Sequence, residues 1–320
     1  MLSATRKPRG TVGLDLDDNY VAAVEMTGGS VTRAVSMEVA PGLVVDGEIV
    51  DPARLAGAIR GFFKQHRLPR VVRVGVANQQ IAVRSFSIPR IDGDDERSAA
   101  VRFQAQDAIA MPLDEAMLDY QVVGETTTPE GIVHLRVVAV AARETMVNRF
   151  VEALRGAGLK PDTIDLDAFA LVRALAPAIE SPGGPLPEGG AEQATAPDGA
   201  RVYTHLAGVT NLAVADGDTC LFARPLTTSL DEDGAVVPAA LADQMRPSIH
   251  FYMQQPGARD VSEVVLAGPG SLNEDLSTEL EGLLSLPVRI ANPAAVVPEA
   301  VTADSPARYT IAAGLAMGTS

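Results

Sequence analysis

Two polar turns in the sequence carry residue types that could do chemistry, and each turn lies between apolar segments. The first turn covers residues 15–19 and contains three carboxylates, and the second covers residues 208–211 and begins with glycine. In a duplicated fold, turns of this kind hold the phosphates of a nucleotide, because glycine lets backbone N–H groups approach a bound anion. These turns therefore suggest a phosphate-binding site, but the acidic residues of the first turn would weaken the binding of an anion there.

The segments around these turns predict two copies of one structural unit. Thr11–Leu16, Val21–Met26 and Ser30–Met37 have alternating or continuous apolar residues and are separated by tight turns, which predicts a three-stranded meander. The same pattern recurs from Val202 to Arg224, about 190 residues later. Such a repeat favours a duplicated fold with a ligand cleft between its halves.

Composition and charge exclude several classes of function. The net charge is −15, of which −12 lies in residues 179–320, so the carboxyl-terminal part offers no basic face for a nucleic acid. No apolar run is long enough to cross a bilayer, and no secretory signal is evident near the first residue. These features predict a cytoplasmic protein without direct membrane insertion.

Other kinds of active site are not predicted. Cys220 is the single cysteine, so an internal disulfide and a cysteine-based zinc site are impossible, and its apolar strand predicts a small core residue. The four histidines show no metal-ligand spacing, and no nucleophile or Walker-type motif is present. We therefore expect no catalytic residues and no metal site.

The remaining pattern predicts an α/β protein. Helices are expected where apolar residues recur every three or four positions, and strands where short apolar runs lie between turns. Asp51 and Pro52 are typical of a helix start, with Asp51 as the N-cap. A flexible linker or loop is expected over residues 180–200, which are rich in proline and glycine. The expected elements after the first meander are strands at 71–77, 81–88, 117–123, 132–141, 163–166 and 261–266 and helices at 94–111, 168–175 and 308–317.

Several short motifs in the right order resemble one protein family. The segments are Val83-Arg84-Ser85-Phe86-Ser87-Ile88-Pro89, Leu118-Asp119-Tyr120-Gln121, and Ala157-Gly158-Leu159-Lys160-Pro161 followed by Ile164-Asp165. Together they are similar to the type IV pilus assembly protein PilM family within the actin-like ATPase superfamily. The resemblance extends from Thr11 to Gly318.

The resemblance implies a fold of two duplicated actin-like (ribonuclease H-like) domains. It also implies an inserted subdomain of the SHS2 type and a reduced helical subdomain in the second half. The implied boundaries are 11–69 for the start of the first half, 70–165 for the inserted subdomain, 166–179 for the return to the first half, 180–200 for the linker and 201–318 for the second half.

In PilM-like proteins this fold is a cytoplasmic adaptor. The resemblance therefore implies a role in type IV pilus assembly, in which a groove beside the inserted subdomain captures the cytoplasmic N-terminal tail of a PilN-like inner-membrane protein. The expected partner-binding residues are Arg84, Phe86, Phe103, Ile109 and Tyr120. For Phe86, Ile109 and Tyr120 a plain core role is the alternative, whereas Phe103 falls off the apolar stripe of its helix.

The residues at the implied nucleotide site depart from what an actin-like ATPase needs. Asp17 stands where the family has glycine, Thr204 where the second loop has aspartate, and Pro269 removes a backbone donor from the adenosine turn. Asp17, Asp18 and Asn19 are also simply good turn residues. The site is therefore expected to be degenerate. Its candidate residues are Asp15, Asp17, Asp18, Asn19, Gly208, Val209, Thr210, Asn211, Gly268 and Gly270.

Three functions remain in view at this stage. The first is a nucleotide-independent adaptor, which would be a pseudo-ATPase without a cofactor. The second is a working ATP-binding switch of the PilM kind, which would take ATP and Mg²⁺. The third is a filament-forming relative of the cell-division protein FtsA, which is disfavoured because Met317 to Ser320 follow a core-like helix and supply no amphipathic membrane segment.

Overall fold

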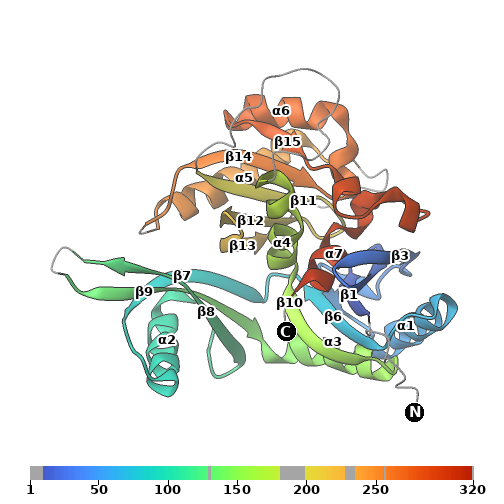
Figure 1. The fold of residues 1–320 in the computed structure, drawn as a ribbon, viewed down its shortest axis with the longest axis horizontal. Coiled ribbons are helices and arrows are strands. Elements are labelled where there is room, and N and C mark those ends of the chain that lie inside the picture. Colours follow the sequence, from blue (N-terminus) through green and yellow to red (C-terminus); the bar gives the residue numbers. More distant parts are fainter. Residues whose placement is uncertain (1–9, 129–130, 181–198, 228–234, 256, 319–320) are drawn as a thin grey trace, which may run out of the picture.

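The computed structural model of the protein describes residues 10–128, 131–180, 199–227, 235–255 and 257–318. Most of the linker predicted at 180–200 lies outside these residues. The described chain forms two five-stranded sheets, one three-stranded sheet and a two-stranded pair, with helices around them (Figure 1). No helix among the described residues is long and apolar enough to cross a membrane.

The first five-stranded sheet has the strand order β10-β6-β1-β2-β3. The meander β1–β3 is antiparallel, while β6 and β10 add parallel to it. Helices α1 and α3 pack together beside this sheet, and the Asp51 side chain caps α1 by accepting the N–H of Arg54 at 3.0 Å, as predicted. The elements of this part are β1 (Thr11–Leu16), β2 (Tyr20–Thr27), β3 (Ser30–Glu38), β4 (Val44–Val45), β5 (Glu48–Ile49), α1 (Pro52–His66), β6 (Val71–Val76), α3 (Glu144–Gly156) and β10 (Lys160–Leu166).

The second five-stranded sheet repeats the plan of the first. Its order is β13-β12-β11-β14-β15, again an antiparallel meander extended by two parallel strands. This repeat confirms the predicted duplication. The elements of this part are β11 (Ala200–His205), β12 (Asn211–Asp216), β13 (Thr219–Pro225), α5 (Pro238–Met253), β14 (Val261–Ala267), η1 (Pro269–Leu272), α6 (Glu274–Leu284), β15 (Val288–Ile290), η2 (Pro293–Ala295), η3 (Glu299–Val301) and η4 (Pro306–Tyr309).

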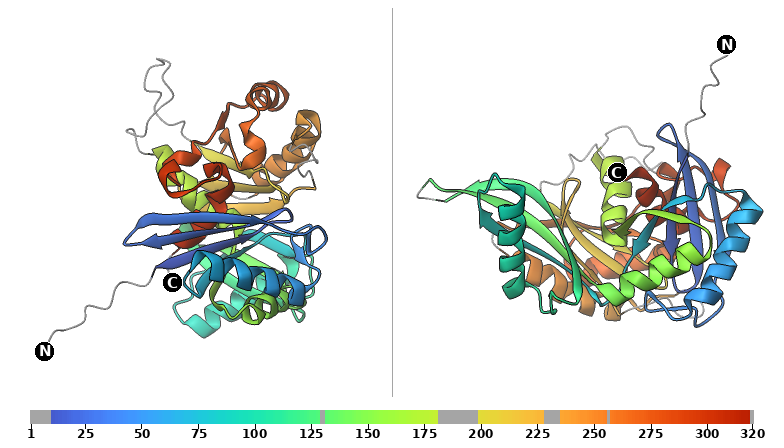
Figure 2. Two further views of the ribbon diagram at one scale, coloured as in Figure 1. Left: turned by 90° about the vertical axis from the view of Figure 1, so that its right-hand side faces the viewer. Right: turned by 90° about the horizontal axis from the view of Figure 1, so that it is seen from below.

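Within the described chain, the three-stranded sheet β7-β9-β8 shares no hydrogen-bonded strand with the other two, touches the second sheet through β7 and β13, and carries helix α2 on one face (Figures 1 and 2). Its bounds are β7 (Ile81–Pro89), α2 (Asp94–Ala108), β8 (Ala116–Thr127) and β9 (Val133–Arg143). Since β6 and β10 pair within the first five-stranded sheet, the separate unit covers residues 81–143 and is smaller than the predicted range 70–165.

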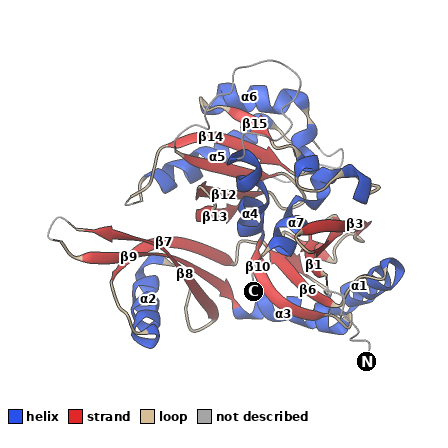
Figure 3. Cartoon of the chain, viewed as in Figure 1, coloured by secondary structure: helices blue, strands red, loops and turns tan. Residues whose placement is uncertain are grey.

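Two helices at the centre of the molecule tie the halves together (Figure 3). Helix α4 (Asp167–Glu180) packs against β12 and β13 of the second sheet. Helix α7 (Thr310–Met317) returns to β1, β2 and β6 of the first sheet and is buried along almost its whole length. A Cβ atom at Gly13 would lie 1.9 Å from the Ala312 carbonyl oxygen, so glycine is required for α7 to lie this close to β1.

Candidate functional site

The structure brings the two predicted turns face to face. The first loop (residues 15–19) covers the end of β1 and the turn into β2, and the second loop (residues 206–211) covers the turn from β11 to the first residue of β12. The Asp17 carboxylate of the first loop accepts two hydrogen bonds from the second loop. Its Oδ1 accepts the Gly208 N–H and its Oδ2 accepts the Val209 N–H, each at 3.2 Å. Oδ1 also accepts the Asn19 N–H at 3.0 Å. The two backbone N–H groups of the second loop are thus already hydrogen bonded to an anion that belongs to the protein.

Two buried carboxylates of the first loop, Asp15 and Asp17, lie near the buried Asp167 of α4. Burial raises the pKa of Asp17 to about 6, although the N–H groups of Asn19, Val209 and Gly208 work in the opposite direction. Burial and the nearby Asp17 and Asp165 raise the pKa of Asp167 to about 8. Burial, Asp167 and Asp17 also raise the pKa of Asp15 well above its ordinary value. These shifts have the sign expected when several carboxylates share a site with no cation.

Several buried oxygen atoms near the two loops have no protein partner. They are Asp15 Oδ2, Asp167 Oδ1, Thr204 Oγ1 and Thr210 Oγ1. Such atoms usually hydrogen bond to water or to a ligand. Within the part of the chain that the structure describes, however, no group of three or more acidic, histidine or cysteine side chains is arranged to hold a metal ion.

The other predicted loop residues have structural contacts. The Asp18 carboxylate accepts the N–H groups of Asp46 and Gly47 at 2.8 and 2.9 Å and so holds the β4–β5 turn. The Asn211 side chain donates to the Val209 carbonyl at 3.3 Å. These bonds agree with the turn role that the sequence also suggested for Asp18.

The third predicted turn packs directly on the second loop. Gly268 has a φ of +87°, and a Cβ atom there would lie 2.6 Å from the Leu206 carbonyl oxygen. That same oxygen accepts the Gly270 N–H at 3.0 Å. Gly268 is therefore accounted for by its left-handed backbone and close packing, while Gly270 contributes a backbone hydrogen bond.

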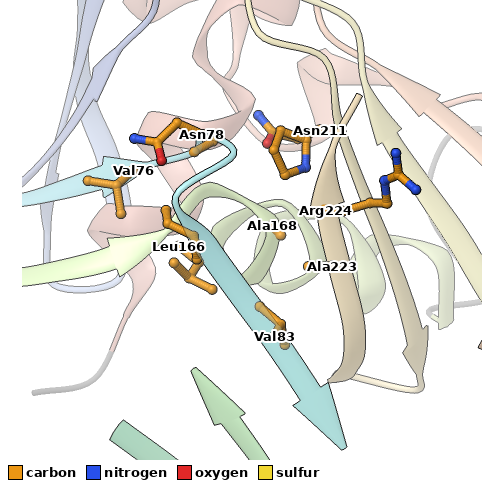
Figure 4. A pocket seen from close by; sticks show the side chains of 11 residues that line it. Val76, Asn78, Val83, Leu166, Ala168, Asn211, Ala223 and Arg224 are labelled. Carbon is orange, nitrogen blue, oxygen red and sulfur yellow. The ribbon is translucent and has the colours of Figure 1, made fainter. Parts of the chain in front are cut away.

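A pocket lies at the junction of the three large sheets (Figure 4). Most of its wall is apolar, while Asn78, Asn211 and Arg224 add polar groups. The lining residues are Val76, Ala77, Asn78, Ile81, Val83, Leu166, Ala168, Asn211, Ala223, Arg224 and Pro225. Of the predicted site residues, this pocket contains Asn211 alone. Its lining comes from the ends of separate strands and the start of α4, so no single sequence motif marked it.

The rim of this junction is basic. The Arg84 guanidinium stacks over the Phe251 ring at 5.4 Å from its centroid. Burial and the nearby Arg224 lower the pKa of Arg84. Among the described residues, no carboxylate forms an ion pair with either arginine. Arg84 Nη1 donates to the Val83 carbonyl at 2.9 Å, and the other N–H groups of Arg84 can donate to oxygen atoms of a partner, as can those of Arg224.

The five predicted partner-binding residues do not form one surface. Ile109 is buried in the small core between α2 and the three-stranded sheet, where Phe86 also packs. The Tyr120 hydroxyl accepts a hydrogen bond from Arg97 Nε at 3.2 Å, and its ring packs on the same sheet. Phe103 is 70% exposed on α2. Arg84 alone of the five lies at the junction beside the pocket.

The duplicated sheets and the central helices define a class of protein. The chain is similar to a protein of actin-like ATPase fold and unknown function from Bacteroides thetaiotaomicron, with a TM-score of 0.51, 12% identity, and 98% of each chain covered. It is also similar to MreB5 of Spiroplasma citri bound to ADP, with a TM-score of 0.50, 10% identity, and 97% and 95% of the two chains covered. The protein has the actin-like ATPase fold, as predicted.

The sequence narrows the class to one family. The family model described as type IV pilus assembly protein PilM matches residues 13–226, which is more than half of the chain. This protein belongs to that family. A solved structure described as the PilM–PilN type IV pilus biogenesis complex matches with a TM-score of 0.75 and 24% identity, covering 96% of this chain and 97% of the other.

Proposed function

We propose that this protein is a cytoplasmic adaptor of type IV pilus assembly that binds the N-terminal cytoplasmic tail of a PilN-like inner-membrane protein. The observation that carries the proposal is the match of nearly the whole chain to a PilM–PilN complex, together with membership of the PilM family. Through such a partner, the protein would be held at the inner face of the cell membrane.

The junction pocket is the proposed place for the tail. Its apolar wall would contact apolar side chains of the tail, and the exposed Arg224 guanidinium would donate to main-chain carbonyls of an extended peptide. Arg84, one of the predicted partner residues, lies near this pocket, since the pocket-lining Arg224 is close enough to lower the pKa of Arg84. The proposed groove therefore lies beside the three-stranded sheet, but it uses different residues from most of those expected.

The proposal also includes a degenerate nucleotide site. The N–H groups of Gly208 and Val209 are bonded to the Asp17 carboxylate, which would also repel a triphosphate. We therefore propose a pseudo-ATPase rather than an enzyme, with no nucleotide cofactor required for binding the tail.

Peptide binding tests the adaptor role. A labelled peptide from the N-terminus of a PilN-like protein should bind the purified protein, as measured by fluorescence anisotropy. Arg224→Glu should weaken binding by about tenfold or more, which corresponds to roughly 1.4 kcal/mol. Arg54→Glu is the matched control, because Arg54 is equally a surface arginine but lies on α1 away from the pocket.

The outcomes separate the parts of the proposal. No binding of the peptide by the wild-type protein would refute the adaptor role, and equal weakening by both variants would refute the pocket. Calorimetric titration with ATP and Mg²⁺ addresses the nucleotide site. Micromolar binding of ATP would show that the protein is a nucleotide-dependent switch.

A further inference from the structure

The second loop holds an anion that comes from the first half of the same chain. We propose that the Asp17 carboxylate is an internal anion that fills the phosphate-type site of the second loop, and so closes the two halves without a bound ligand. Its two oxygens accept the consecutive N–H groups of Gly208 and Val209, which is how a backbone nest binds a small anion. This inference deepens the proposed degenerate site and rests on that part of the proposed function; it is independent of the PilN-like tail.

The shape of the second loop is matched to Asp17. A Cβ atom at Gly208 would lie 2.4 Å from Asp17 Oδ1 and 3.0 Å from Asn19 Nδ2. The absence of a side chain at Gly208 is therefore what allows the first loop to approach. The contact accounts for both residue types: Gly208 leaves room for the Asp17 side chain, and the Asp17 carboxylate accepts the Gly208 N–H. The two residues are 191 positions apart in the sequence.

The electrostatic surroundings make these N–H bonds the main support of the Asp17 carboxylate. Asp17 is 6% exposed, so water provides little stabilisation. The titratable groups that interact with it are Asp15 and Asp18 on its own loop and Asp167 on α4, all of them acidic. The Asn19 N–H supplies the third hydrogen bond from within the first loop. Among the described residues, the Asp17 carboxylate is therefore held by backbone amide donors and forms no ion pair with a lysine or arginine.

This contact excludes a phosphoryl group from the same place. A phosphate at the second loop would need the N–H groups of Gly208 and Val209, and it would bring a second negative charge next to Asp17. Ligand binding would thus require the Asp17 side chain to leave. Removing that side chain should have two effects at once: it should free the two amides and create room for an anion.

Hydrogen–deuterium exchange on the full-length protein measures the first effect. Exchange of the Gly208 and Val209 amides should be at least about tenfold faster in Asp17→Gly than in the wild type. Asp18→Asn is the matched control, because Asp18 also accepts two backbone N–H groups, but both lie within the first half. In that variant the exchange of Gly208 and Val209 should match the wild type.

Anion binding measures the second effect. Inorganic phosphate and Mg-ATP should slow amide exchange of the second loop in Asp17→Gly and leave the wild type unchanged. Equal exchange of Gly208 and Val209 in the wild type and the variant would overturn the proposal, as would equal protection of both proteins by phosphate. If Asp17→Gly does not fold, Asp17→Asn tests the first effect: it keeps the shape, removes the charge and leaves a single acceptor oxygen for the two amides, so their exchange should still be faster than in the wild type.

The two proposals fail in different ways. If the internal anion is wrong, the exchange experiment fails while the PilN-like peptide still binds. If the adaptor role is wrong, the peptide does not bind, whatever the exchange of the second loop shows.

Discussion

Gly314 of α7 lies directly against the backbone of Ala170 in α4. A Cβ atom at Gly314 would stand 1.9 Å from the Ala170 carbonyl oxygen and 2.5 Å from its carbonyl carbon. The Gly314 carbonyl in turn accepts a hydrogen bond from Arg173 Nη1 at 2.8 Å. The crossing of α4 and α7 between the two sheets is therefore made by backbone in contact with backbone.

Gly314→Ala should destabilise the protein. The clash is with backbone, which cannot move aside as a side chain can, so we expect a loss of at least about 1–3 kcal/mol in the free energy of unfolding. Gly61→Ala is the control, because Gly61 lies in α1 with open space around its Cβ position and should gain about 0.5–1 kcal/mol. Urea denaturation of the two variants measures both values. A neutral Gly314→Ala would mean that the helices can separate at no cost.

The stability of the protein should fall as the pH rises. The pKa of Asp167 is about 8 in the folded state against 3.8 for an ordinary aspartate, so the folded state binds more protons across this window. Its contribution to stability is complete below pH 3.8 and is lost as the pH approaches 8. Asp15 and Asp17, which face Asp167 from the first loop, shift in the same direction.

Asp167→Asn should flatten this dependence. The neutral amide keeps the size of the side chain and removes the proton-dependent charge, so the melting temperature should change less between pH 5 and 8 than in the wild type. The measurement is thermal unfolding at several pH values. A wild-type protein that becomes more stable from pH 5 to 8 would contradict the assignment.

Glu263 holds a buried ion pair in the second sheet. Its carboxylate accepts Arg201 Nε at 2.6 Å and Arg289 Nε at 2.9 Å, and Arg201 and Glu263 are 5% and 6% exposed. Glu263→Ala leaves the Arg201 charge buried without this carboxylate and should reduce stability by roughly 3–5 kcal/mol. Asp243→Ala removes the acid of the exposed Arg246–Asp243 pair and should change the stability of the protein by less than about 1 kcal/mol. If chemical denaturation gave the same loss of stability for Glu263→Ala and Asp243→Ala, the buried ion pair would be no more important than the exposed one.

Gly208→Ala and Asp17→Gly should be coupled. Alone, Gly208→Ala pushes a methyl group into Asp17 Oδ1 and should cost about 1–3 kcal/mol of stability. In an Asp17→Gly background the main obstacle is gone, so the same substitution should cost clearly less. A double-mutant cycle measures the coupling. Additive effects would indicate that the two residues do not touch in solution.

Much of the fold could be predicted because its signals are local. The expected strands Thr11–Leu16 and Ser30–Met37 match β1 and β3 to within one residue, since alternating apolar residues and glycine turns mark them directly. Cys220 is buried, as its apolar strand indicated. Helix 94–111 was predicted too long, because Ile109 adopts an extended backbone and turns into the small core.

The site was harder to predict because its contacts join distant parts of the chain. Asp17 satisfies local turn chemistry, and nothing near it in sequence reveals that its carboxylate reaches Gly208. The junction pocket is similarly built from residues of several elements, of which Asn78 and Arg224 carry no motif. For Phe86 and Tyr120 the sequence left open a core role, and both pack against the small core of the three-stranded unit.

The position of α7 also shapes how a newly made chain can fold. The first sheet presents β1 and β2 early in synthesis, but the helix that covers them is translated after all the other described elements. Packing α7 onto β1 and β2 brings together residues separated by most of the polypeptide. This step is slow compared with the formation of a hairpin. We expect the apolar face of β1 and β2 to stay uncovered during this interval, while the second sheet can assemble before the first is finished. The first part of the protein to be made should therefore be among the last to reach its native packing.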